Sequence, residues 1–403
     1  MSPMSDSNAG GSQRLYLDHA STSWPKREGV VEAMAAFMVD CGASPSRGQY
    51  KSARQAGTIV QQTRQRLAEV LNAEDSSCVS FQSGCTVALN VAIQGLVRSG
   101  EHVIASSVEH NSVLRPIFAA TDLCDIVDCD SDGRMQVERI ISRVCDSTRL
   151  IALTHASNVT GIVQPVRELS AAVLELNQQR PADRQIVVLC DAAQTFGYLP
   201  VDVGALGVQL LAAPAHKGCG GPSGIAFLYV HPTLHGTIRP LIQGGSGHDG
   251  LSETMPVEMP GCLEPGTMNI AAIAGWQAAI QDWGPGEKDA GQLFAGQLQQ
   301  HAVRLHNGLA SIDGIRVVGG VGALPIASID FGPMLPPSDA AAILDHDFGI
   351  DVRAGFHCAA RIHRLLGTQS SGTVRISCGH TTTAADIDRV VQAVAEIAAS
   401  LNV

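Results

Sequence analysis

The chain has 403 residues, of which 45% are hydrophobic and 16% are charged, and its formal net charge is −11. This length exceeds the usual size of one hydrophobic core and favours a large domain with a smaller one, while the composition excludes a disordered chain. The acidic balance argues against a nucleic-acid or anionic-membrane partner, since nothing here would replace condensed counterions.

The N-terminus and the cysteines indicate the compartment. Residues 1–13 are polar and rich in serine and glycine, which predicts a flexible segment and not a signal peptide. No apolar stretch reaches the roughly 20 residues of a membrane span. The eleven cysteines are scattered, with no zinc-type cluster and no metal site, so most should be small buried hydrophobic residues of a reducing compartment. The sequence predicts a cytoplasmic protein.

Residues 77–217 alternate short apolar runs with longer amphipathic stretches. This is the βαβ pattern of a largely parallel sheet covered by helices, which is an α/β fold. Strands are predicted at residues 77–81, 102–105, 150–153, 185–190 and 210–215, and a helix over residues 87–98.

The rest of the chain predicts a second domain. Residues 228–269 are rich in glycine and proline, which indicates loops at a domain or subunit border, and Gly284-Pro285-Gly286 breaks the next amphipathic stretch. We expect a flexible segment at 1–13, a large domain at 14–283 and a small α+β domain at 284–403. Within the last, helices are predicted over 289–309 and 384–401, and strands over 315–318 and 327–331.

Polar groups follow five successive strand candidates of the large domain. Ligands of open α/β sheets bind outside the carboxyl ends of the strands, so these groups predict one cofactor site. They are Ser83-Gly84-Cys85-Thr86, His110, Asn158, Asp191 and Lys217.

Lys217 and Asp191 together predict which cofactor this site binds. A lysine at a strand end can simply reach water. Beside an aspartate at the neighbouring strand end, however, it is suited to hold the aldehyde of pyridoxal 5′-phosphate as a Schiff base, because desolvation favours the neutral amine. The aspartate would keep the pyridine nitrogen protonated.

Other polar residues extend this hypothesis, each with a structural alternative. Ser83-Gly84-Cys85-Thr86 is a phosphate cradle at a helix N-terminus, with Thr86 as the side-chain contact, or only a turn and cap. His110 would lie over the ring and shuttle protons, or would cap a helix. The amides of Asn158 and Gln194 would hydrogen-bond the ring oxygen O3′.

Cys358 and Arg375, in the C-terminal part of the chain, are candidates for a reactive thiol and for a group that binds a substrate carboxylate. Cys358 has His357, Arg353 and Arg361 nearby in sequence, which can lower a thiol pKa; the alternative is a buried structural thiol. Arg375 lies inside an apolar strand-like run and needs an anionic partner, either a substrate α-carboxylate or an internal Asp or Glu.

The ordered motifs resemble the class V aminotransferase group of fold-type I pyridoxal-phosphate enzymes, and within it the cysteine desulfurase and selenocysteine lyase family. The resemblance covers nearly the whole chain and implies a mostly parallel seven-stranded sheet between helices. The motifs are Ser-Gly-Cys-Thr (83–86), Glu-His-Asn-Ser-Val (109–113), Ser-Asn-Val-Thr-Gly (157–161), Asp-Ala-Ala-Gln (191–194), His-Lys-Gly (216–218), Pro-Gly-Thr-Met-Asn (265–269) and Arg-Ala-Gly-Phe-His-Cys-Ala (353–359).

The resemblance also implies residue roles. Lys217 would bind the cofactor, Asp191 its pyridine nitrogen and Gln194 its ring hydroxyl. His110 would stack on the ring as an acid–base group, with Asn158 near the ring and the substrate carboxylate. Thr86 and His216, in the cradle with Cys85, would hold the phosphate, and Thr267 would reach the phosphate of the other subunit of a homodimer. Arg375 would clamp the substrate carboxylate, and Cys358 would become a persulfide.

Three departures from the family pattern indicate a divergent subgroup. Pro214 stands where many relatives have a phosphate-binding serine, Val87 where they have a glutamate, and His19 where they have an asparagine. The short stretch between Cys358 and Arg375 resembles the short-loop group, in which the persulfide is sheltered and needs an acceptor protein.

The leading hypothesis is an L-cysteine desulfurase in which Lys217 takes the Cα proton and Cys358 takes the sulfur, leaving alanine. A selenocysteine lyase, or another class V lyase or aminotransferase, is the alternative. A third hypothesis is a protein that keeps the fold as a sulfur carrier or binding partner without turnover.

Overall fold

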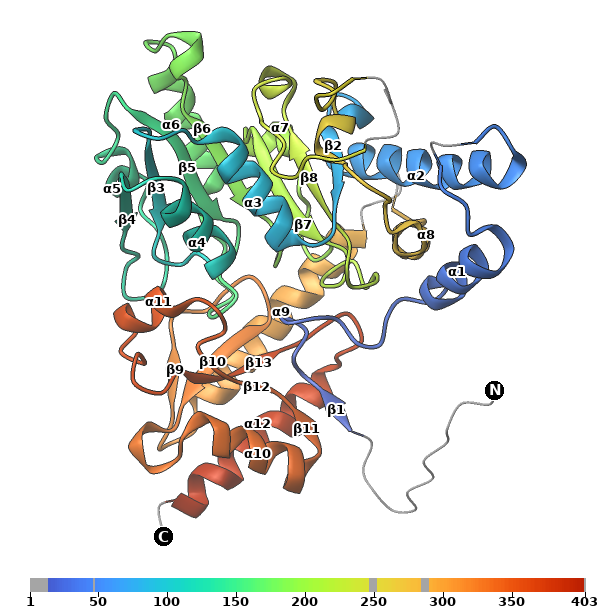
Figure 1. The fold of residues 1–403 in the computed structure, drawn as a ribbon. Coiled ribbons are helices and arrows are strands. Elements are labelled where there is room, and N and C mark those ends of the chain that lie inside the picture. Colours follow the sequence, from blue (N-terminus) through green and yellow to red (C-terminus); the bar gives the residue numbers. More distant parts are fainter. Residues whose placement is uncertain (1–13, 46–47, 246–251, 284–289, 402–403) are drawn as a thin grey trace.

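The computed structural model describes residues 14–45, 48–245, 252–283 and 290–401, with side chains except at 290–294. Two bodies are visible, with the larger sheet above and the smaller below in Figure 1. The Gly284-Pro285-Gly286 break and the segment 1–13 lie outside the described residues. Within the described part, no helix has both the length and the apolar character to cross a membrane.

The large sheet has seven strands in the order β2-β8-β7-β6-β5-β3-β4. Only β8 runs against its neighbours, so the expectation of a mostly parallel sheet is confirmed. The strands are β2 (Val79–Gln82), β3 (His102–Ser106), β4 (Cys124–Val127), β5 (Thr148–Thr154), β6 (Val187–Asp191), β7 (Leu210–Pro214) and β8 (Ala226–Val230).

Helices cover both faces of this sheet, which explains why its central strands read as continuous apolar runs. Alternate residues of one strand serve the two faces: Val103 packs with α3 and α4, whereas Ile104 packs with α2, α6 and α8. The helices of this domain are α1 (Val30–Ala36), α2 (Lys51–Val70), α3 (Cys85–Leu96), α4 (Asn111–Ala120), α5 (Val137–Ile141), α6 (Val166–Asn177), α7 (Val203–Leu206) and α8 (Ile270–Ala279).

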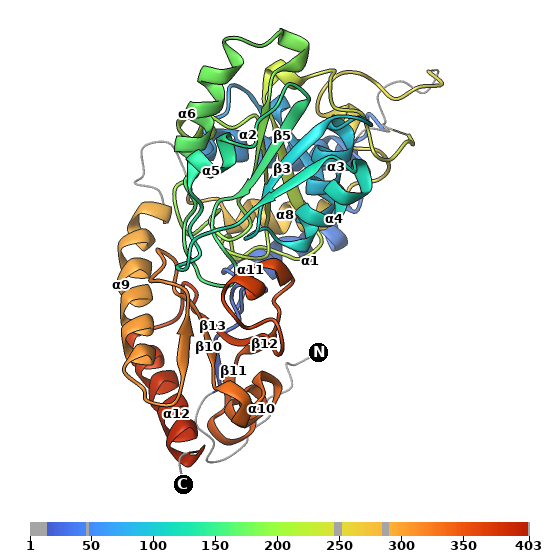
Figure 2. The ribbon, with the colours of Figure 1, turned by 90° about the vertical axis from the view of Figure 1, so that its left-hand side faces the viewer.

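The small domain is a four-stranded antiparallel sheet, ordered β12-β13-β10-β9, with α9 and α12 side by side on one face (Figure 2). Its helices are α9 (Ala290–Ala310), α10 (Pro337–Phe348), α11 (Ala360–Leu365) and α12 (Ala384–Leu401). Its strands are β9 (Arg316–Val318), β10 (Ile326–Asp330), β12 (Arg353–Gly355) and β13 (Thr373–Ser377).

A strand near the N-terminus pairs with a strand of the small domain. Strand β1 (Leu15–Tyr16) pairs in parallel with β11 (Ile350–Asp351), so residues placed in the large domain by the sequence boundary at 14 pair with the small one. Two other details differ from the sequence expectations. The irregular region begins after β8, not at Leu228, and β4 was not predicted, because only its last residue, Val127, is buried.

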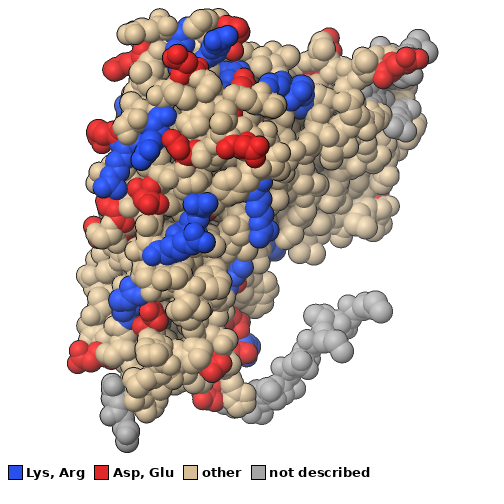
Figure 3. Space-filling view, turned by 60° about the vertical axis from the view of Figure 1, so that its left-hand side comes forward, with Lys and Arg blue, Asp and Glu red and all other residues tan. Residues whose placement is uncertain are grey.

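Charged side chains are interspersed on the surface shown in Figure 3, where acidic and basic groups alternate over the large and the small domain. The net charge of −11 is therefore not gathered on that face.

Candidate active site

One cavity of about 400 Å³ lies where the carboxyl ends of the parallel strands face the small domain. Most of the residues selected from the sequence line it, so the prediction of a single site at the strand ends agrees with the structure. The lining residues from that set are Cys85, Thr86, His110, Asn158, Asp191, Gln194, His216, Lys217 and Arg375.

Asp191 and Lys217 lie at the floor of this cavity. Asp191 ends β6, is buried, and accepts a hydrogen bond from the Ala193 N–H at 3.0 Å. Burial raises its pKa, although the Ala193 amide and the Lys217 charge oppose the rise. Burial also lowers the pKa of Lys217, which Asp191 partly counteracts. The pair therefore combines a carboxylate in need of a cationic partner with an amine biased toward its nucleophilic form.

The start of α3 lies at the cavity. Gly84 is the N-cap residue and provides no side-chain cap, so the first amides of the helix open toward the cavity. Thr86 Oγ1 lies 2.8 Å from Ser112 Oγ, and His216 Nδ1 is buried without a protein partner. Pro214 also lines the cavity but has no hydroxyl to offer a phosphate.

His110 both caps a helix and lines the cavity. Its Nδ1 accepts from the Ser112 N–H at 3.0 Å at the start of α4. Burial and then the Lys217 charge lower the His110 pKa to about 4, so the ring is neutral at pH 7. With Nδ1 occupied as an acceptor, the ring proton resides on Nε2. The structural and the functional interpretation of this histidine are therefore compatible.

The two amides make contacts that the sequence did not predict. Asn158 Nδ2 donates to the His357 carbonyl oxygen at 2.6 Å, and Gln194 Nε2 donates to the Ala20 carbonyl oxygen at 3.1 Å. Gln194 Oε1 is buried without a partner. Each amide keeps one further N–H, so a contact to a ring oxygen remains a prediction for both.

Glu109 is a polar group that the sequence reasoning did not select. It is fully buried between two strand ends, where its Oε1 accepts from Ser106 Oγ at 2.5 Å and from the Thr154 N–H at 2.8 Å. Its Oε2 has no partner. The available signal was a carboxylate directly preceding His110 at a strand end.

Replacing Glu109 by glutamine is expected to stabilise the protein increasingly as the pH rises from 5 to 8. Burial raises the pKa of Glu109 from 4.5 to about 8. Between these values the folded state holds a proton that the unfolded state has lost, so wild-type stability falls by up to about 1.4 kcal/mol per pH unit. Glutamine keeps the acceptor and removes this titration.

Thermal unfolding midpoints of wild type and Glu109→Gln at the two pH values measure the effect, with Glu138→Gln on the surface of α5 as the control. A midpoint difference that stays constant with pH would mean that Glu109 is ionised in the folded protein throughout.

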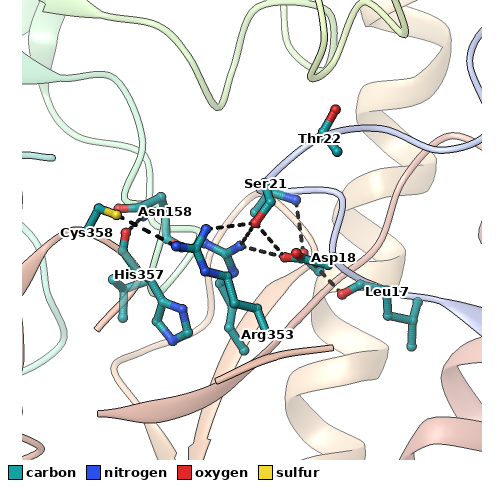
Figure 4. A network of polar contacts seen from close by, with 12 residues as sticks. Leu17, Asp18, Ser21, Thr22, Asn158, Arg353, His357 and Cys358 are labelled. Carbon is teal, nitrogen blue, oxygen red and sulfur yellow. Dashed lines mark hydrogen bonds and ion pairs between the residues drawn. The ribbon is translucent and has the colours of Figure 1, made fainter. Parts of the chain in front are cut away.

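Cys358 is exposed and follows His357, which lines the cavity, and Figure 4 shows its sulfur directed toward Arg353. The Arg353 Nη2–Cys358 Sγ distance is 3.7 Å, and Arg353 itself lines the cavity. The other two expected neighbours are turned away. Nε2 of His357 contacts Thr373 Oγ1 at 2.9 Å, and burial lowers its pKa, so it supplies no charge. Arg361 instead lies over the Phe118 ring.

The loop that carries Cys358 is held in a costly backbone conformation. His357 and Cys358 have positive φ angles of 50° and 59°, which non-glycine residues rarely adopt. Two contacts from the large domain hold this turn. Asn158 donates to the His357 carbonyl, and the Asn111 N–H donates to the Cys358 carbonyl at 2.8 Å. The thiol is thereby fixed relative to the helix that follows His110.

Arg375 has the internal anion that the sequence left open. Its Nη2 donates to Asp18 at 2.7 Å and to Ser21 Oγ at 2.8 Å, while Nη1 donates to the Asn158 carbonyl at 3.1 Å. Its Nε is buried without a partner, and the guanidinium lines the cavity. Asp18 therefore holds the arginine and leaves the Nε N–H free for a ligand.

Replacing Arg375 by lysine is expected to raise the KM for an α-carboxylate substrate by roughly 10- to 100-fold, with a smaller change in kcat. Lysine keeps the charge beside Asp18 but has no N–H at the position of Nε, so the charge-assisted hydrogen bond to the carboxylate is lost, at about 1.5–3 kcal/mol. Steady-state kinetics measure it. The control is Arg316→Lys, in an exposed ion pair with Asp330. An unchanged KM would remove Arg375 from the substrate site.

Thr267 does not join the other residues. It lines a separate cavity of about 260 Å³ together with Ser83 and Val87. Its predicted role depends on a second subunit and stays a prediction.

These groups fit pyridoxal 5′-phosphate. The cavity has a helix N-terminus and an unpartnered histidine nitrogen suited to a phosphate, and a buried carboxylate suited to a pyridinium. It also has a partly desolvated lysine suited to an aldehyde.

Comparisons with known proteins agree with this picture. Residues 15–390 match the family model described as aminotransferase class-V. A probable cysteine desulfurase of Methanothermobacter thermautotrophicus is 32% identical over 401 residues, covering 95% of this chain and 94% of the relative. Two solved cysteine desulfurases have the same fold. The apo enzyme of Thermococcus onnurineus has a TM-score of 0.84 at 26% identity, covering 96% of this chain and 95% of that one. CsdA of Escherichia coli has a TM-score of 0.82 at 27% identity, and the match covers 96% of this chain and 95% of that one.

Proposed function

Because the chain belongs to the class-V aminotransferase family of pyridoxal-phosphate-dependent enzymes, we propose that it is a cysteine desulfurase. The observation that supports this most directly is the position of Cys358. An exposed thiol lies 3.7 Å from a guanidinium that lines the cavity with Lys217, so a nucleophile stands at the edge of a cofactor site.

The proposed reaction converts L-cysteine and the Cys358 thiol into L-alanine and a Cys358 persulfide. The bond between substrate carbon and sulfur breaks, a sulfur–sulfur bond forms on Cys358, and alanine keeps the hydrogens that balance the exchange. The bound cofactor supplies the electron sink for the bond broken at Cα.

The residues of the cavity would bind the substrate, transfer protons and position the thiol. Arg375 binds the substrate carboxylate through its free Nε and orients the amino acid. Lys217 moves the Cα proton, since burial favours its neutral form. His110 would hold a proton on Nε2 in the cavity, and the Arg353 guanidinium, with its Nη2 3.7 Å from the sulfur, would orient Cys358.

Phosphate and ring contacts complete the proposal. The start of α3 at Cys85, Thr86 and His216 would hold the phosphate, and Asp191 the pyridine nitrogen. Asn158 and Gln194 would use their remaining N–H groups toward the ring oxygen.

The proposed assembly is a homodimer in which Thr267 contributes to the partner's site. The location of Thr267 outside the Lys217 cavity supports this arrangement. We also propose a cytoplasmic location, supported by eleven free cysteines, and a sulfur-acceptor protein that receives the persulfide.

Selenocysteine lyase activity is the second candidate, because Pro214 changes the phosphate site and marks a divergent subgroup. The purified holoenzyme is incubated with equal concentrations of L-cysteine and L-selenocysteine, and the release of alanine is measured. We expect L-cysteine to be converted with formation of a Cys358 persulfide. Faster conversion of L-selenocysteine without a persulfide would replace the desulfurase assignment by the lyase.

A further inference from the structure

A second group of chemically reactive side chains lies at the opposite end of the large sheet from the cavity. His102 and Thr148 are the first residues of β3 and β5 and pair with each other, whereas the cavity residues follow the last residues of the strands. Cys145 precedes Thr148 in the turn that enters β5, and Asp125 lies in β4 beside β3. The length of the sheet thus separates this thiol from Cys358.

Cys145, His102 and Asp125 form a connected thiol cluster. The Cys145 Sγ–His102 Nδ1 distance is 3.5 Å, and the His102 Nε2–Asp125 Oδ2 distance is 3.7 Å. The imidazole is buried, whereas the thiol is exposed and the side chain of Asp125 is 46% exposed. All eleven cysteines lie in the described residues, and Cys145 and Cys358 are the two exposed ones. The cluster therefore places a reachable sulfur beside an imidazole that Thr148 Oγ1 holds at 2.9 Å and that has a carboxylate on its other side.

Hydrogen bonds around the sulfur favour its thiolate. Slight burial opposes ionisation, but contacts from Ser147 Oγ at 3.3 Å and Thr148 Oγ1 at 3.4 Å outweigh it and lower the pKa of the Cys145 thiol. Burial also lowers the pKa of His102, against the charge of Asp125, so the imidazole is neutral and can accept a proton.

One further cation supports the turn. Arg180 donates to the carbonyl oxygens of Cys145 at 3.2 Å and Thr148 at 3.0 Å, which closes the turn that carries the thiol. Asp146, the next residue, places one negative charge on the same turn, and Arg180 also donates to its carbonyl at 2.7 Å. Arg180 therefore holds the turn through the carbonyl oxygens of Cys145, Asp146 and Thr148.

We propose that Cys145 is a second reactive thiol, independent of the desulfurase site, which exchanges with low-molecular-weight disulfides to form a mixed disulfide. The thiol proton passes to His102 Nδ1 through the Thr148 hydroxyl, whose Oγ1 lies 3.4 Å from the sulfur and 2.9 Å from Nδ1. The Cys145 thiolate attacks one sulfur of the disulfide, a new sulfur–sulfur bond forms to Cys145, the original bond breaks, and the other half leaves as a thiolate. One thiol is oxidised and one disulfide sulfur is reduced, so electrons balance.

The first test is alkylation by iodoacetamide, followed peptide by peptide across a pH series in the Cys358→Ala protein. The midpoint for Cys145 is expected below about 8.5, the value of an unperturbed thiol. Cys124 is an internal control in the neighbouring strand, because burial raises its pKa to about 11. A Cys145 midpoint at or above the unperturbed value overturns the proposal.

The second test exposes the same protein to oxidised glutathione and measures the intact mass and the modified peptide. One glutathionyl group on Cys145 is expected, with none in a Cys145→Ser variant. His102→Gln should slow the reaction at least about tenfold, and Asp125→Asn should slow it less, since Asp125 acts only through the imidazole. Asp125 is half-exposed, so this variant folds even if His102→Gln does not.

Equal rates in wild type and in both variants, or modification only at other cysteines, would overturn the proposal. Neither test requires L-cysteine turnover. The outcome is therefore separate from that of the desulfurase assignment.

Discussion

Cys358→Ala is expected to abolish persulfide formation and to reduce alanine release from L-cysteine by at least about a hundredfold. The thiol is the group that takes the sulfur, and the alanine side chain offers no nucleophile in its place. Binding of L-cysteine should persist, because Arg375 and Lys217 are unaltered. Persulfide is measured by intact mass and by a sulfane-specific reagent, and alanine by amino-acid analysis.

The matched control for this variant is Cys145→Ser, which removes the second exposed thiol. It should retain both alanine release and a persulfide on Cys358. Persulfide formation at the wild-type rate in Cys358→Ala would show that another cysteine takes the sulfur, and Cys85, which lines the cavity, would be the first to examine.

The sequence predicted the site better than it predicted the contacts inside the site. Parallel strands bring their carboxyl ends to one edge, so residues at strand ends such as Asp191 and Lys217 meet whatever the details of packing. Five strand ends were therefore enough to predict one cavity. The same argument does not predict in which direction a side chain at a strand end points, or which groups it contacts.

The neighbours of Cys358 illustrate this limit. Sequence proximity suggested His357, Arg353 and Arg361 equally, and could not say which of them lies beside the sulfur. The His357 ring contacts Thr373 in a turn with two consecutive positive φ angles, and only Arg353 of the three lies beside the sulfur. Such a conformation depends on contacts from Asn111 and Asn158, more than 190 residues away in the chain. A local sequence pattern therefore cannot predict these contacts.

The pairing of β1 with β11 is another feature that local sequence could not predict. It joins segments more than 300 residues apart, and the short strand β1 has no distinctive alternation. Its consequence is functional, because the chain that follows β1 brings Asp18 and Ser21 to the two arginines of the small domain. The N-terminal segment thus fixes the guanidinium groups that face the cavity from β12 and β13.

Lys217→Ala is expected to reduce alanine release by at least about a thousandfold and to abolish covalent retention of the cofactor. Lys217 is proposed both to bind the cofactor aldehyde and to move the Cα proton, so one substitution removes two functions. Borohydride reduction followed by intact mass measurement reports the first function without turnover: wild type should gain the mass of the reduced cofactor and the variant should not.

Lys26→Ala is the matched control, because Lys26 is another partly buried lysine near the site, with its Nζ 3.3 Å from the His216 carbonyl oxygen. This variant should keep the borohydride-fixed cofactor. Added methylamine should restore part of the activity of Lys217→Ala, since a small amine can enter the space of the missing side chain and accept a proton there. Cofactor fixed to another lysine in Lys217→Ala, with activity retained, would contradict the assignment. If methylamine restores activity while no cofactor is fixed to the protein, the variant has lost both functions and the amine replaces only proton transfer. Both functions then belong to the Lys217 nitrogen in wild type.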